Sequence, residues 1–222
     1  LFVAMLDARG IAGAARLVSR GIDGDVPSKP FGDDADYAWA PDGKSMVFAA
    51  RIAGRTEPWS TNFDLYLATV DGSEAPVNLT AANPATDTGP VYSPDGRTLY
   101  YRAMKRPGFE ADRFQIRALD LASRNARDIA ADWDRSPEGL VVAPDGRTLY
   151  TTVADLGAGS LFAVDIASGK RTRLDNRGTV AGVTVGRDAI VYGRDDLKST
   201  AQLYRLSPRG GEPVALTRFN AA

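Results

Sequence analysis

The sequence predicts an all-β fold, a β-propeller fragment built from four-stranded antiparallel blades. A Pro-Asp-Gly turn recurs around Asp42, Asp95 and Asp145, at spacings of 53 and 50 residues, and a worn copy without proline lies at 185–188. Short apolar strands flank every copy, and two more strand-like segments follow each hairpin before the next turn. Four strands in a repeat of about 40 to 50 residues are typical of a propeller blade.

The turn sequence explains why each repeat contains a hairpin. Proline presets φ at the first corner, aspartate can bond back to the backbone, and glycine accepts the positive φ that closes the reversal. We therefore interpret Asp42, Asp95 and Asp145 as turn residues rather than as metal ligands.

The expected strands follow the turns in order. First strands lie at 37–39, 91–92, 140–142 and 182–185, and second strands at 46–50, 99–102, 149–153 and 190–193. Third strands lie at 65–70, 114–119, 161–166 and 202–206, and fourth strands at 76–80, 126–130, 172–174 and 213–217. Segments 1–7 and 14–19 match the third and fourth strands of one further blade. The predicted domain organisation is a half blade at 1–20 and blades at about 36–80, 90–130, 139–174 and 180–217, about four and a half in all.

Composition excludes several kinds of chemistry within this chain. With no histidine and no cysteine, it cannot form a Ser/His/Asp triad, a Cys/His dyad, a disulfide or the usual zinc sites. Because 27 basic residues balance 28 acidic ones, we expect no nucleic-acid partner, and no apolar run approaches the length of a membrane helix. We expect no cofactor, no metal and no membrane contact, and the compartment, periplasmic or cytoplasmic, stays open.

Two long insertions mark one side of the repeat array. They lie between the expected second and third strands, at 52–63 and 103–113, where the later blades have only 155–159 and 194–200. Asymmetric insertions in a repeat array usually mark its binding side. Trp59 in the first insertion could form an apolar wall or pack on its own blade, and the charges around Phe109 could bind a ligand or pair with one another. The acidic cluster Asp33, Asp34 and Asp36 is better explained as a solvated loop.

Several segments resemble the propeller of the prolyl oligopeptidase family of serine peptidases, in its bacterial type-five dipeptidyl peptidase and acylaminoacyl peptidase branch. They are the Pro-Asp-Gly blades, Phe-Glu-Ala-Asp-Arg at 109–113, Asp-Trp-Asp-Arg-Ser-Pro at 132–137 and Leu-Thr-Arg-Phe-Asn at 216–220. The resemblance covers essentially the whole chain. It implies a ring of seven or eight blades and a C-terminal α/β-hydrolase domain, absent here, whose linker would begin at 218–222.

The resemblance also implies a division of labour. The propeller would cap the hydrolase site and gate peptide access, and acidic residues on a propeller loop would bind the free α-amine of the peptide. Glu110 is the first candidate for that anchor and Asp112 the second. Arg113 or Arg106 would orient them or bind substrate carbonyls, and Trp59 and Phe109 would be apolar walls. Expected partners are therefore peptide substrates, the hydrolase domain, and further copies of the chain through open blade edges.

Two other functions compete with this one. A TolB-like propeller acting as a protein-protein interaction module shares the same blade turns. A sugar-binding propeller would repeat an aromatic platform in each blade, but Trp39, Trp59 and Trp133 do not occupy equivalent positions. We rank that function last.

Overall fold

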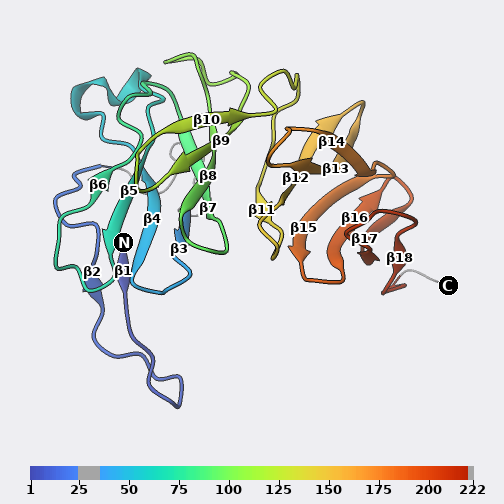
Figure 1. Cartoon of the computed structure of the whole chain (residues 1–222), viewed down its shortest axis with the longest axis horizontal. Helices are drawn as coiled ribbons and strands as arrows, with labels where there is room; N and C mark the ends of the chain where they lie inside the picture. The colour runs from blue at the N-terminus through green and yellow to red at the C-terminus, as the bar shows by residue number, and fades with distance from the viewer. Residues whose placement is uncertain (25–35, 220–222) are drawn as a thin grey trace.

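The computed structural model describes residues 1–24 and 36–219, and these form β-strands and one short 3-10 helix (Figure 1). Asp33, Asp34 and Asn220 lie outside the described residues. Four units of four antiparallel strands follow one another along the chain, and a two-stranded sheet precedes them. The predicted fold class, an all-β array of propeller blades, is confirmed.

The four units are numbered here as sheets. Sheet I contains β3 (Tyr37–Trp39), β4 (Ser45–Ala50), β5 (Asp64–Thr69) and β6 (Val77–Asn78), and sheet II contains β7 (Asp87–Tyr92), β8 (Thr98–Ala103), β9 (Gln115–Asp120) and β10 (Ala126–Ile129). Sheet III contains β11 (Val141–Val142), β12 (Thr148–Asp155), β13 (Ala158–Asp165) and β14 (Arg171–Asp175). Sheet IV contains β15 (Thr179–Val185), β16 (Ile190–Asp196), β17 (Ser199–Leu206) and β18 (Val214–Ala215), and one parallel bridge joins it to sheet III.

The Pro-Asp-Gly turns have the backbone that their residues predict. Gly43, Gly96 and Gly146 adopt φ values of 69°, 71° and 70°. In each turn the aspartate carboxylate accepts the backbone N–H two residues later, at 2.9 to 3.1 Å. The aspartates therefore hold the turns, as predicted.

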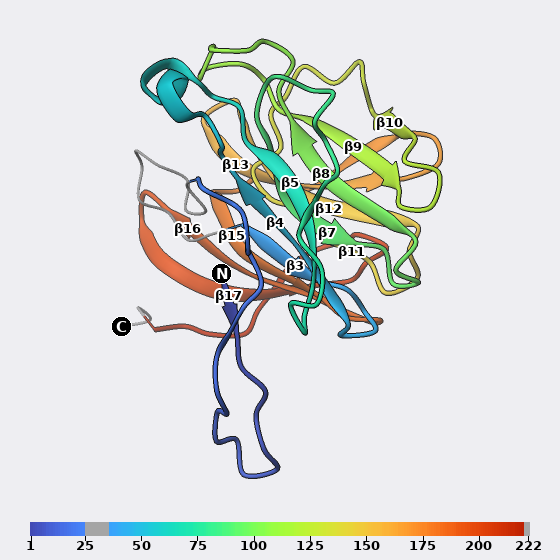
Figure 2. The same ribbon diagram turned by 90° about the vertical axis from the view of Figure 1, so that its left-hand side faces the viewer.

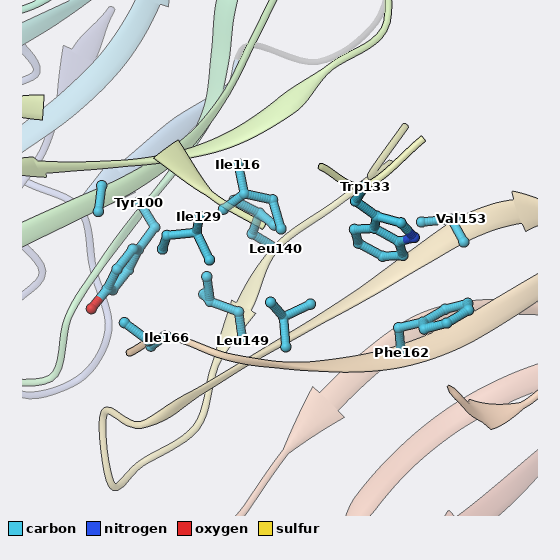
Figure 3. Packing of buried hydrophobic residues seen from close by; sticks show 11 residues of the cluster. Tyr100, Ile116, Ile129, Trp133, Leu140, Leu149, Val153, Phe162 and Ile166 are labelled. Carbon is cyan, nitrogen blue, oxygen red and sulfur yellow. The ribbon is translucent and has the colours of Figure 1, made fainter. Parts of the chain in front are cut away.

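Apolar side chains fill the space between successive sheets. One cluster joins sheets II and III through residues such as Ile116, Leu149 and Phe162 (Figure 3). Sheets I and II share a second cluster that includes Leu65 and Leu99, and sheets III and IV share a third. Because a blade buries each of its faces only against a neighbour, stability in such arrays comes largely from these interfaces.

The N-terminal strands β1 (Phe2–Val3) and β2 (Arg16–Leu17) form the two-stranded sheet, and the segment between them projects away from the other sheets (Figure 1). Val18, which is 1% exposed, packs against Met46 and Phe48 of sheet I. The N-terminal segment therefore packs on sheet I through an apolar cluster, as the complete sheets pack on one another.

Strand β7 is longer than the sequence indicates. It begins at Asp87, whereas the pattern predicted a strand only at 91–92. Gly89 and Pro90 obscure the first half, because both residues argue against a strand interior. The structure accommodates them in an irregularity between Thr88 and Val91, where Gly89 has a φ of 61°.

Candidate functional site

The candidate site lies where two long connections meet at one end of sheets I and II. The first insert, residues 51–63, joins β4 to β5 and contains the 3-10 helix η1 (Gly54–Trp59). The second insert, residues 104–114, joins β8 to β9, and both lie at the end opposite the Pro-Asp-Gly turns (Figure 2). The Gly108 N–H donates to Thr61 Oγ1 at 3.0 Å, so the two inserts are in direct contact. In sheets III and IV the equivalent connections are tight turns.

Asp112 organises the second insert. Its carboxylate accepts the backbone N–H groups of Lys105 and Arg106 at 2.8 and 2.9 Å, and Arg106 Nε at 2.9 Å. Burial alone would raise the pKa of Asp112, but these donors outweigh it and lower the pKa to about 2. The carboxylate is thus charged and already engaged by its own loop, which leaves Asp112 poorly suited to anchor a ligand.

Glu110 lies on the same loop in a different environment. It is exposed and makes no hydrogen bond or ion pair with any residue in 1–24 or 36–219. Next to it, the Arg106 guanidinium lies 4.0 Å from the centre of the Phe109 ring, which is 43% exposed. A cation over an aromatic face stabilises both groups. The loop therefore holds Arg106, Phe109 and Asp112 in place and leaves the Glu110 carboxylate available.

Trp59 lies at the end of η1 and is 69% exposed, so it does not pack on its own blade. Nearby in the same insert, Glu57 Oε1 accepts from the terminal nitrogen of the buried Arg51 at 2.7 Å, and Arg51 also donates to the Ser60 carbonyl. These bonds tie η1 to the end of β4. The indole is therefore presented to solvent by a braced loop.

Arg113 is half-buried, and its side chain has no hydrogen-bond or ion-pair partner within the described ranges. The structure therefore brings Arg106, Phe109 and Asp112 into mutual contact. Glu110 and Arg113 flank this group without binding to it, and Trp59 belongs to the adjoining insert.

A half-buried arginine near the inserts escaped the sequence analysis. Arg102, in β8, lies 3.7 Å from Asp36 and 5.0 Å from the Phe114 ring. Burial lowers its pKa, although Asp36 and Glu138 oppose that shift. Asp36 also accepts from the Thr88 hydroxyl and from the Gly89 N–H, so it links sheets I and II and is not the solvated loop residue that was predicted. Only tertiary proximity joins these residues, which is why no local pattern indicated them.

The described part of the chain contains no group of three acidic side chains placed to hold a metal ion. Its helical content likewise includes no segment long and apolar enough to cross a membrane.

Known proteins resemble this chain in sequence. Dipeptidyl-peptidase 5 from Porphyromonas gingivalis is 27% identical over 200 residues, which cover 89% of this chain and 29% of that protein. A probable dipeptidyl-peptidase 5 from Emericella nidulans is 35% identical over 146 residues, which cover 63% of this chain and 20% of that protein. The chain is homologous to dipeptidyl-peptidase 5. It spans less than a third of the length of these relatives, and no family model matches it.

The homology to dipeptidyl-peptidase 5 agrees with the fold. A puromycin hydrolase superposes with a TM-score of 0.70 at 21% identity, over 97% of this chain and 34% of that protein. A TolB protein from Agrobacterium tumefaciens superposes with a TM-score of 0.65 at 18% identity, over 82% of this chain and 64% of that protein. At these identities the superpositions establish the propeller fold, and the predicted peptidase resemblance is confirmed by the sequence homology.

Proposed function

We propose that this chain is the non-catalytic propeller region of a serine exopeptidase of the dipeptidyl or acylaminoacyl peptidase type. It caps the active site of an α/β-hydrolase domain in the same polypeptide, gates peptide access and helps to recognise the peptide N-terminus. The homology to dipeptidyl-peptidase 5 supports the class of enzyme. The absence of histidine from the sequence requires that a histidine-dependent triad be supplied by another domain.

The geometry of the inserts is the observation that carries the recognition role. A peptide amine is an ammonium ion at neutral pH, and a carboxylate binds it strongly through a charge-assisted hydrogen bond. Glu110 is an exposed carboxylate without an internal partner, on a loop braced by Asp112 and Arg106. A fixed anchor of this kind selects which peptide bond reaches a nucleophile.

The direction of the chain supports capping on this side. Phe219 donates its N–H to Gln202 Oε1, near the start of β17, at 3.0 Å. Because β17 starts at the end where β4 and β8 enter the inserts, Phe219 lies at the insert-bearing end. Trp59 and Phe109, both exposed, belong to the inserts at this same end.

The proposal is tested in the full-length protein with a chromogenic dipeptide that has a free amine and with its N-acylated twin. Glu110→Gln should lower kcat/KM for the free-amine substrate by more than about tenfold, or roughly 1.4 kcal/mol. It should leave the acylated substrate unchanged, because only the amine contact is lost. Glu74→Gln, an exposed acid on the connection between β5 and β6, is the matched control and should change neither rate.

Two results would count against the proposal. Equal cleavage of both substrates, with no effect of Glu110→Gln, would make the second insert structural. Cleavage of neither would favour a TolB-like interaction module, which the superposition on TolB supports. In that case the exposed inserts would be a protein-binding surface.

A further inference from the structure

Sheet II departs from its neighbours at one position of the third strand. In the other sheets that position carries an aromatic ring, which packs on a second ring at centroid distances of 5.1 to 6.0 Å, namely Tyr66 on Phe48, Phe162 on Trp133 and Tyr204 on Tyr192. The strand register places Arg117 opposite Tyr101 in sheet II, as Tyr66 lies opposite Phe48 in sheet I. An arginine therefore replaces the ring that fills the space between blades elsewhere.

A second position of the same strand, Gln115, lacks a hydrogen-bond partner that its equivalents in two other sheets have. Gln115 lies two residues before Arg117, and the equivalent residues of sheets I and IV are Asp64 and Gln202. In each of those sheets a threonine after the fourth strand donates a hydrogen bond to that side chain, Thr80 to Asp64 and Thr217 to Gln202. In sheet II the residue after Ile129 is Ala130, which has no hydroxyl. Gln115 is only 5% exposed, and its amide has no hydrogen-bond partner among the described residues.

Gln115 and Arg117 line a cavity of about 420 Å³ between sheets I and II. Tyr101, Gln115 and Arg117 form one wall, and Thr80 and Asn83 belong to the other. This volume falls within the range of roughly 300–1,000 Å³ that is typical of small-molecule sites. The side-chain amide of Gln115, a residue that is 5% exposed, lines the cavity without a hydrogen-bond partner among the described residues.

The charges of the cavity favour an anion. Asp128 is its acidic side chain, and it lies 3.0 Å from Arg117 Nε and 3.8 Å from Lys105 Nζ. Arg124 contributes a third base to the lining. In the lining one carboxylate faces three cations, and a further acid, the buried Asp87, bonds to Asn83 with a pKa that burial raises to about 7. An excess of positive charge therefore remains in a partly buried space, where Coulomb interactions are stronger than in water.

We propose that this cavity binds a small carboxylate of about dipeptide size. The carboxylate lies against the Arg117 guanidinium and Lys105, and the Gln115 amide binds a peptide-type N–H or carbonyl group of the ligand. Guanidinium and carboxylate groups match in geometry as well as in charge. The site adjoins the second insert through Lys105, but it does not depend on the proposed peptidase function.

The probes are the dipeptide Ala-Ala and its C-terminal amide, titrated calorimetrically into the 222-residue chain at low ionic strength. Ala-Ala should bind at least tenfold more tightly than the amide, which lacks the negative charge. Arg117→Phe restores the ring found in the other sheets and should weaken Ala-Ala binding at least tenfold while preserving the thermal midpoint. Arg117→Gln should also weaken it, whereas Arg205→Gln, an exposed arginine in β17, is the matched control and should not.

Gln115→Met keeps the experiment decisive if the arginine variants fold poorly, since it removes the amide without changing charge. It should weaken both probes. Absence of Ala-Ala binding, equal binding of acid and amide, or binding unaffected by Arg117→Phe and Gln115→Met would each overturn the proposal.

Discussion

At the scale of single residues, Asp87 is the buried acid with the most direct link to the inserts. It is fully buried, Oδ1 accepts from Asn83 at 2.9 Å, and Oδ2 has no hydrogen-bond partner. Burial is the main cause that raises its pKa to about 7; Asp64 adds to the shift, and Asn83, Thr80 and Arg117 oppose it. The Asp87 N–H bonds to the Phe63 carbonyl, and Asn83 bonds to that of Met104, so this acid lies where both inserts begin or end.

The raised pKa predicts a pH dependence with a definite sign. The folded state holds the proton more tightly than an unfolded chain, in which the pKa is near 3.8. The associated stability is therefore fully present below about pH 4 and is lost as the pH rises toward 7. When the pH is raised from 5 to 8, we expect the loss of the Asp87 proton to lower the free energy of unfolding by roughly 2–3 kcal/mol. Urea denaturation at the two pH values measures this change.

Asp87→Asn is the control for that prediction. The amide keeps an acceptor for Asn83 and cannot ionise, so the difference between the two pH values should shrink in the variant by about the stated amount. An identical pH dependence in both proteins would show that Asp87 does not titrate in this range.

At the scale of elements, the β12–β13 hairpin contains a residue that its backbone does not favour. Leu156 adopts a φ of 52° and is 89% exposed, and Gly157 follows with a φ of 82°. Two consecutive positive φ values define the turn for which Asn-Gly is preferred. The backbone of a leucine in this conformation is strained, and the exposed side chain gains no burial that would offset the strain.

Leu156→Asn should therefore raise the free energy of unfolding by about 0.5–1 kcal/mol, since asparagine tolerates the left-handed conformation. Chemical denaturation measures the gain. Leu197→Asn provides the comparison, because Leu197 is equally exposed at the neighbouring β16–β17 turn but is not among the residues with positive φ. A gain of similar size in both variants would mean that replacing an exposed apolar side chain with a polar one, rather than relief of backbone strain, is responsible.

At the scale of the whole molecule, the contacts between sheets II and III decide whether the array unfolds as one unit. Phe162 is 9% exposed and packs edge-on against Trp133, at 5.1 Å between ring centroids, in the cluster shared by the two sheets (Figure 3). Because repeat arrays depend on nearest-neighbour interfaces, a loss here weakens both partners.

Phe162→Ala should lower the free energy of unfolding by about 3–5 kcal/mol, the usual cost of removing a buried aromatic ring. It should also separate the unfolding of the N-terminal and C-terminal halves. Calorimetry would then show two transitions where the wild-type chain shows one. A single transition at nearly unchanged temperature would indicate that the interface contributes little.

The C-terminal side of sheet IV bears on the predicted self-association. Val214 in the edge strand β18 is 60% exposed, and Leu203 in the adjoining strand β17 is 45% exposed. Association of copies through such edges stays a prediction, as does the role assigned to Glu110.

The repeat and its turns could be predicted from the sequence because they depend on local chemistry. Proline, aspartate and glycine set the hairpins around Asp42, Asp95 and Asp145, and alternation of apolar residues indicates the strands. The positions of the two inserts followed from the same repeat. The homology to dipeptidyl-peptidase 5 agrees with the family resemblance that the sequence predicted.

Contacts between distant residues were decided only by the tertiary structure. The sequence left Asp112 open as either an anchor or a partner of its own loop, and only the fold shows its three donors. The link from Asp36 to Gly89, the burial of Asp87 and the cavity beside Arg117 each join segments far apart in the chain. Local patterns report backbone preference and burial periodicity, whereas pairing and desolvation of charges depend on which blades become neighbours.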